Sequence, residues 1–217
     1  TASVNSLYND SFTAQVNRQF NPSGTDQAFT YEGGKVTGWE LACDVDGLLG
    51  VNLDVDFENA LTATALAAAS YTSGMEVMSY VGGTISIAGA TVLTESFSLK
   101  ADNGLRTDKR HLGSSFKRQQ VENQKRTYEF ELNVDFDALA NYNRIASSTA
   151  AGALGSIVAE FRGPTILGTA TYPSLIVTMP NCRFDGQGPS VSGEEAIMQT
   201  LTGVALTTAA SGSPVVI

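Results

Sequence analysis

Alternation of apolar and polar residues is the commonest pattern along this chain, and it predicts β-strands. In residues 51–58, Val51, Leu53, Val55 and Phe57 share one face while Asn, Asp and Glu take the other. Residues 128–137 repeat the arrangement. A strand with carboxylates on one face and large apolar groups on the other is covered on one side only. This pattern is typical of an antiparallel sandwich or barrel wall and not of a parallel sheet.

The same alternation recurs along most of the chain. Its apolar positions are Phe12, Ala14 and Val16; Trp39, Leu41, Cys43 and Val45; Ile85 and Ile87; Phe97 and Leu99; and Leu175, Val177 and Met179. Asp46-Gly47 separates two of these strands and predicts a hairpin turn. The chain of 217 residues is long enough for one large core. We therefore predict an all-β, sandwich or barrel-like fold in a single domain over residues 1–217.

Two segments depart from the strand pattern. Residues 137–145 predict a short flanking helix, with Asp137 as its N-cap and Leu139 and Tyr142 facing inward. Residues 60–69 are rich in alanine but also carry threonines, so helix and non-helical structure both remain open. Residues 101–126 are polar and lack periodicity, which predicts a loop longer than most compact domains contain, and loops of this length are usually functional or disordered.

Charge is distributed unevenly. The net charge is −9, which argues against general nucleic-acid binding, since phosphate neutralisation needs surplus Lys and Arg. Residues 100–126 nevertheless hold 8 of the 13 basic residues. A molecule with one basic segment and acidic surroundings can attract copies of itself. The alternative is a solvated basic loop without a partner.

The residues of known catalytic and metal sites are missing. The one histidine, His111, lies in the basic loop and is a poor candidate for a Ser-His or Cys-His pair. Asp44-Val-Asp46-Gly47 lacks the later positions of a calcium loop. Asp54 and Asp56 could pair for glycoside hydrolysis, but same-face carboxylates on a strand are usually a solvated surface. We predict no enzyme, no cofactor and no metal.

Cysteines and apolar runs add two further constraints. Cys43 and Cys182 are the two cysteines, and either one disulfide or two buried thiols fits the sequence. There is no run of 18 apolar residues, so no membrane partner is expected. The chain begins with Thr1, which suggests a mature or truncated form.

The order of several stretches carries a family resemblance. They are Gly33-Gly-Lys-Val-Thr-Gly-Trp39, Thr84-Ile-Ser-Ile-Ala-Gly89, Ser96-Phe-Ser-Leu-Lys-Ala-Asp-Asn103-Gly-Leu-Arg106, Arg126-Thr-Tyr-Glu-Phe-Glu-Leu-Asn-Val-Asp-Phe-Asp137 and Leu175-Ile-Val-Thr-Met-Pro180-Asn-Cys-Arg-Phe. Over roughly residues 10–207 the chain resembles the major tail tube proteins of long-tailed, non-contractile bacteriophages (the siphophage type).

That resemblance implies a structural virion protein. It implies a β-sandwich with one flanking helix that assembles into rings of six copies. The rings stack into the tail tube through which DNA is ejected into the host. The lumen would hold DNA and the tape-measure protein without sequence-specific binding, and other tail proteins would meet the tube ends. The protein would be assembled in the host bacterial cytoplasm and reside in the phage tail.

Two sets of residues follow as candidate sites. The long loop, residues 101–126, corresponds by position to the family's inter-ring loop, and its contact residues would be Arg106, Lys109, Arg110, His111, Lys117, Arg118, Lys125 and Arg126. A conduit for DNA should repel it weakly, so at least one acidic strand should face the lumen. The candidates are Asp54, Asp56, Glu58, Glu129, Glu131, Asp135 and Asp137. The alternative is that these carboxylates face outward to solvent.

Other functions remain possible at this point. One is another phage tail or connector protein built on a related sandwich. A second is a carbohydrate-binding or adhesin-type β-sandwich module, which would need exposed aromatic residues, and Trp39 lies in a core phase. A third is a hydrolase on a β-scaffold.

Overall fold

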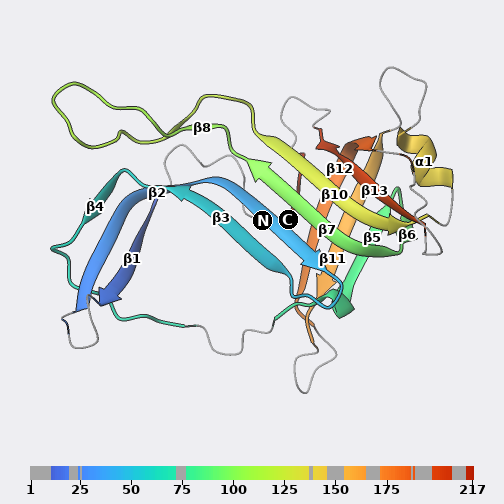
Figure 1. Cartoon of the computed structure of the whole chain (residues 1–217), viewed down its shortest axis with the longest axis horizontal. Helices are drawn as coiled ribbons and strands as arrows, with labels where there is room; N and C mark the ends of the chain where they lie inside the picture. The colour runs from blue at the N-terminus through green and yellow to red at the C-terminus, as the bar shows by residue number, and fades with distance from the viewer. Residues whose placement is uncertain are drawn as a thin grey trace.

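The computed structural model has an all-β fold with one short α-helix, as predicted (Figure 1). It describes residues 11–19, 24, 26–71, 77–136, 139–145, 154–164, 172–186, 188, 197–206 and 214–217. The strands are β1 Phe12–Gln19, β2 Asp26–Asp44, β3 Gly50–Asp56, β4 Asn59–Leu61, β5 Gly83–Ile87, β6 Ala90–Val92, β7 Thr94–Asp102, β8 Leu105–Arg106, β9 Val121–Glu122, β10 Thr127–Asp135, β11 Gly155–Arg162, β12 Ser174–Gly186 and β13 Met198–Ala205. The helices are the 3-10 turn η2 Tyr80–Gly82 and α1 Leu139–Ile145.

One antiparallel sheet contains all the described strands except the small β8–β9 pair. Its order is β1-β2-β7-β10-β13-β12-β11-β5-β6, and β3 and β4 also pair with β2. The first half of the long strand β2 pairs with β1 and β4, whereas its second half pairs with β3 and β7. We call β1, β4 and the first half of β2 the arm, and the remaining strands of the sheet the body. The arm projects from the body at one side of the molecule (Figure 1).

The body sheet coils over its own apolar face and encloses the core. Phe97 of β7 packs against Phe161 of β11 with 5.8 Å between ring centroids, although these strands are not neighbours in the sheet. Predicted apolar positions that are confirmed as buried include Leu41, Cys43, Ile85, Ile87, Phe97, Leu99, Val177 and Met179. The predicted turn at Asp46-Gly47 joins β2 to β3, and the amide of Gly47 donates to the carbonyl of Asp44. Both cysteines are free and buried, so the two-thiol alternative holds.

The helix exists, but the prediction of its inward face was wrong. Leu139 is 62% exposed and Tyr142 37% exposed, whereas Asn141 is buried. The helix packs near β12, where the guanidinium of Arg144 lies over the ring of Phe184 at 5.9 Å. The side of the helix toward the sheet therefore carries Asn141, Arg144 and Ile145, and Ile145 packs against the core. The predicted N-cap, Asp137, lies outside the described residues.

The alanine-rich segment and the long loop have less regular structure. Residues 62–71 form no helix, and β4 occupies only the three residues before them. The loop predicted at residues 101–126 begins two residues later, because Ala101 and Asp102 still belong to β7. Residues 103–126 connect β7 to β10, and the β8–β9 pair ties the base of the loop together. Gly104 supports this base with a φ of +61°, a conformation that glycine adopts at little cost.

Candidate assembly surfaces

One face of β3, β2, β7, β10 and β13 presents three rows of side chains, because directly paired residues lie on the same face of a sheet. The first row is Asn52, Glu40, Lys100, Glu129, Val204 and, on β12, Arg183. The second row is Asp54, Gly38, Asp102 and Thr127. The third row is Ala42, Ser98, Glu131, Thr202 and, on β12, Asp185. We call these three rows the polar face.

The polar face is acidic. Its rows hold six carboxylates, those of Glu40, Asp54, Asp102, Glu129, Glu131 and Asp185, against two cations, Lys100 and Arg183. Lys100 lies directly between Glu40 and Glu129 in the strand register, in a depression of about 380 Å³ that Glu131 and Asp185 also line. Two cations among six carboxylates leave the surface with a net negative charge, so it repels polyanions at short range.

Hydrogen bonds between side chains fix the alignment of the adjoining strands. Asn133 of β10 donates from Nδ2 to Oγ of Ser96 on β7 at 2.8 Å, and Oγ1 of Thr200 on β13 donates to Oδ1 of Asn133 at 2.7 Å. The three side chains form a ladder across β7, β10 and β13 on the same side as Glu129 and Glu131. Register therefore holds the acidic rows in place.

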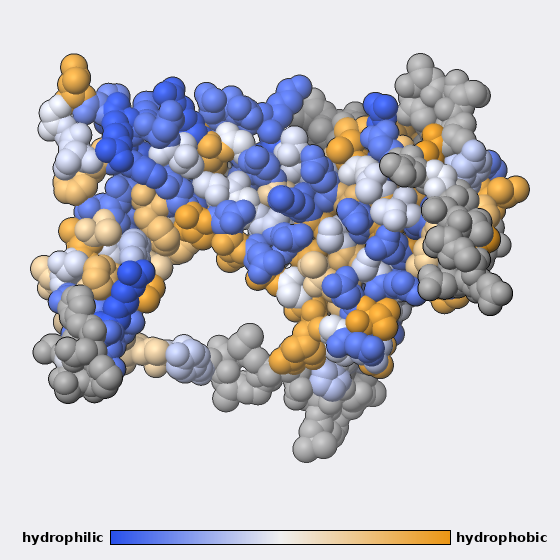
Figure 2. Space-filling view, viewed as in Figure 1, coloured by the Kyte–Doolittle hydropathy of each residue, from blue (hydrophilic) through white to orange (hydrophobic). Residues whose placement is uncertain are grey.

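The opposite face of β3 is apolar and exposed. Val51 and Leu53 each retain 58% of their surface, although the alternation predicted that they would be covered. Each is paired with an inward residue of β2, Leu41 and Trp39 respectively. Hydrophobic side chains border the open space between the arm and the body on this side (Figure 2). Among the described strands β3 pairs only with β2, so its second edge is free as well.

The cations of the long loop fall into two groups. Lys117 and Arg126 form ion pairs within the chain, with Asp56 and Glu122 respectively. Arg106 pairs with Asp108 at 2.8 Å near the surface, and its hydrogen bond holds the pKa of the Asp108 carboxyl below its usual value. The remaining candidates are exposed or half-buried, namely Lys109, Arg110, His111, Arg118 and Lys125. The upper margin of the molecule, where the loop lies, is strongly hydrophilic (Figure 2).

A buried polar cluster attaches the loop to β2 and β3. Nζ of Lys117 lies 2.5 Å from Oδ1 of Asp56, and Nε2 of Gln120 donates to Oδ2 of Asp56 at 3.0 Å. Nζ of Lys35 donates to the carbonyl of Gln120 at 3.1 Å. Lys35 and Gln120 are only 2% and 1% exposed. We call these four residues the latch, because they hold the loop against its own chain.

The latch was missed from sequence. Lys35 and Gln120 are 85 positions apart, and neither stands in a motif. Burial of a lysine requires a partner, so a lysine at an alternating strand position was the only available signal. The latch also removes Asp56 from the open part of the polar face and Lys117 from the free cations of the loop.

The structure places the other acidic candidates in different surroundings. Asp54, Glu129 and Glu131 are exposed on the polar face, and Asp135 is half-buried at the end of β10. Glu58 is half-buried, and its side chain covers Gly33 of the arm. Asp137 lies outside the described residues. Glu40, Asp102 and Asp185 belong to the same surface but were not among the candidates, because the sequence does not reveal which strands are neighbours.

The part of the chain that the structure describes contains no grouping of side chains typical of a catalytic or metal site. No group of three or more His, Cys, Asp and Glu residues there could hold a metal ion. Burial raises the pKa of the Cys182 thiol to about 12. The pKa of the Cys43 thiol is also raised, mainly by burial and to a smaller extent by the negative charge of Asp44. Both thiols are therefore protonated and poor nucleophiles at neutral pH. None of the described helices has the length and apolar character needed to cross a membrane.

Comparison with known families identifies the chain. A family model described as phage tail tube protein matches residues 2–205, nearly the whole length. The chain belongs to the phage tail tube protein family. A search of curated proteins finds no match. Membership makes this tail tube protein a structural component of the phage virion, and its surfaces are those of a part that is assembled with others in a tail.

Proposed function

We propose that this tail tube protein assembles into rings of identical copies that stack into the tube of a non-contractile tail, the conduit for DNA. The observation that carries the proposal is strand β3. One of its edges has no partner strand in the described part of the chain, one face is acidic and solvated, and the other face is apolar and remains exposed at Val51 and Leu53. Exposed apolar surface and unpaired strand edges require cover. A neighbouring copy supplies that cover, and ring closure leaves no edge behind.

The polar face lines the lumen in this arrangement. Its carboxylates repel the phosphates of DNA, which carries one negative charge per ~1.7 Å of helix axis, so the DNA slides without adhering. The tape-measure protein occupies the same lumen before ejection. Six copies per ring, assembly in the host cytoplasm and contact of the tube ends with other tail proteins follow from the likeness to siphophage tail tubes.

The long loop joins one ring to the next through its exposed cations. Arg106, Lys109, Arg110 and Arg118 meet the acidic body of a copy in the adjacent ring. Stacking should weaken as salt rises, because exposed charge pairs are screened over about 8–10 Å at physiological ionic strength. Reversing the charge of these four residues should leave folded protein that no longer forms tubes. Tubes of normal length from that variant would exclude this role of the loop.

Strand β3 provides the decisive experiment. Leu53→Lys places a charge on the apolar face, whereas Asn52→Lys places the same charge on the polar face of the same strand, one residue away. Purified variants are concentrated at low salt and viewed by negative-stain electron microscopy. We expect tubes from wild type and from Asn52→Lys, and none from Leu53→Lys, with circular dichroism unchanged in all three. Tubes from Leu53→Lys would refute the proposed interface.

The micrographs also separate the competing functions. Single rings without stacking indicate a joining protein of the tail, and monomers that bind glycans indicate a carbohydrate-binding module. A map of assembled tubes in which Glu129 and Glu131 face the outer wall would exclude the acidic lumen.

A further inference from the structure

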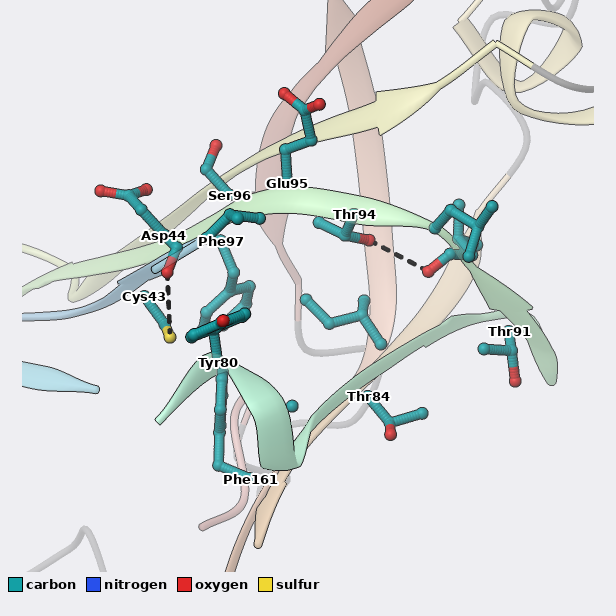
Figure 3. A pocket seen from close by; sticks show the side chains of 15 residues that line it. Cys43, Asp44, Tyr80, Thr84, Thr91, Thr94, Glu95, Ser96, Phe97 and Phe161 are labelled. Atoms are coloured by element: carbon teal, nitrogen blue, oxygen red, sulfur yellow. Dashed lines mark hydrogen bonds between the residues drawn. The ribbon is translucent and has the colours of Figure 1, made fainter. Parts of the chain in front are cut away.

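An apolar cleft opens where the coiled sheet fails to close. It encloses about 230 Å³ between the start of β7 and the β5–β6 hairpin, and β6, the last strand of the sheet, does not pair with β7 in the described part of the chain. Its apolar lining includes Val45, Val92, Leu93, Phe97 and Phe161. The rings of Phe97, Tyr80 and Phe161 stand together at one side of the cleft (Figure 3). Leu93 is 65% exposed.

Two acidic residues, Asp44 and Glu95, lie beside this cleft. Both are exposed, and their carboxylates point outward from β2 and β7, away from Tyr80 and Phe161 (Figure 3). A third carboxylate, Asp46, accepts a hydrogen bond from Tyr80, which raises the pKa of that phenol. An apolar socket beside carboxylates fits a ligand that carries an apolar side chain next to cations.

The tip of the long loop has that composition. Leu112 is fully exposed and stands in a turn closed by a hydrogen bond from the amide of Ser114 to the carbonyl of His111 at 3.3 Å. Lys109 and Arg110 precede it. Figure 2 shows a hydrophobic projection at the far end of the otherwise hydrophilic loop. A leucine surrounded by water makes no contribution to the fold of its own chain, and burying it elsewhere is favourable.

The tip and the cleft lie at opposite ends of the same strand. β7 begins beside the cleft at Thr94 and ends at Asp102, where the loop departs. Nine extended residues separate the two ends by about 30 Å, and the loop points away from the β6 end (Figure 1). The tip of one copy therefore cannot enter its own cleft. A contact between tip and cleft joins two different surfaces of two copies. When each copy repeats this contact, the assembly grows along the direction of β7.

We propose that Leu112 inserts into the β5–β6–β7 cleft of a copy in the next ring, with Lys109 and Arg110 facing Asp44 and Glu95 of that copy. This inference rests on the proposed function and identifies the socket that receives the inter-ring loop. The occupant of the cleft is a second copy of this chain, because its own loop tip carries the complementary shape and charge.

Two single variants and their mixture test the contact. Leu112→Asp removes the apolar tip, and Leu93→Lys blocks the cleft with a charge that repels Lys109 and Arg110. Both side chains are mostly exposed, so the fold should survive. Leu139→Asp, on the exposed face of α1, is the matched control. Each protein is concentrated alone at low salt before equal amounts are mixed, and assembly is measured by electron microscopy and analytical ultracentrifugation.

We expect wild type and Leu139→Asp to form tubes. Leu112→Asp alone and Leu93→Lys alone should each form only the unit that exists before stacking, a ring or a single copy. The mixture should contain paired units and no long tubes. In the mixture only one tip-to-cleft contact can form, because Leu93→Lys has an intact loop tip and Leu112→Asp has an intact cleft. Pairing in the mixture also shows that neither variant is misfolded.

Several results would overturn the inference. Tubes of wild-type length from Leu112→Asp would do so, as would an absence of pairs in a mixture whose components melt like wild type. If Leu93→Lys does not fold, Thr91→Lys replaces it, since Thr91 is also an exposed part of the cleft. Failure of wild type to form tubes would instead refute the proposed function, and pairing in the mixture would still decide whether tip and cleft bind.

Discussion

Removal of the latch carboxylate should release the long loop from the body without unfolding the core. Asp56→Ala deletes the acceptor of two hydrogen bonds, from Lys117 at 2.5 Å and from Gln120 at 3.0 Å. A hydrogen bond to a charged group contributes about 1.5–3 kcal/mol, whereas fully exposed ion pairs contribute about 0–1 kcal/mol. The side chains of Asp56 and Lys117 retain only 20% and 29% exposure. We therefore expect loop docking to weaken by about 2 kcal/mol, since partial exposure discounts the full charged-bond value.

Hydrogen exchange measures that change directly. A loss of about 2 kcal/mol corresponds to about 30-fold in the opening equilibrium, so amides in residues 117–124 should exchange about 30-fold faster. Asp56→Asn, which retains an acceptor for Gln120, should show a smaller effect. Asp54→Ala, an exposed carboxylate on the same strand, is the control and should change stability by less than about 0.5 kcal/mol. Equal exchange in Asp56→Ala and Asp54→Ala would show that the latch does not hold the loop.

Two further predictions concern the core. Phe97→Ala should lower the free energy of unfolding by about 3–5 kcal/mol and the melting temperature by roughly 6–20 °C, because it leaves a cavity beside Phe161. The control is Phe116→Ala at an exposed position, which should change the melting temperature little. Equal melting temperatures of the two variants would contradict the assigned core. The pKa of Cys182 rises from 9.0 to about 12 on folding, so its contribution to stability is present below pH 9 and is lost as pH rises toward 12. The urea midpoint of unfolding should therefore fall more steeply above pH 9 in wild type than in Cys182→Ala. The Cys182 thiol should react with thiol reagents only when the protein is unfolded. Rapid reaction of this thiol in the native state would count against its burial.

The strand pattern was predictable where both neighbours of a strand are present in the same chain. Leu132 and Leu99 alternate with polar residues and are completely buried, because β7 and β10 have partners on both sides. The same alternation in β3 gave the correct strand but the wrong environment for Val51 and Leu53. Their cover lies outside the single chain, and a one-dimensional pattern records that a face is apolar without stating which molecule covers it. The predicted inward face of α1 was also wrong, because Asn141 and Ile145, and not Leu139 and Tyr142, are the side chains turned toward the sheet.

The residues of the candidate sites divide in the same way. The sequence predicted that the loop is basic and that residues 51–58 and 128–137 are acidic on one face. It contained no information that Asp54 and Glu129 share a face across four strands, or that Lys117 binds Asp56. Those facts depend on the order of the strands in the sheet, which is set by contacts between residues far apart in the chain.

The all-β class, the hairpin at Asp46-Gly47, the position of the long loop and the uneven charge could be predicted from the residues alone, because each depends on residues close together in the chain. Three features required the folded chain: the acidic positions share one face of the sheet, the loop is attached through Lys35 and Gln120, and an apolar cleft lies about 30 Å from the loop along β7. Strand register and sheet coiling bring together side chains that no local pattern connects.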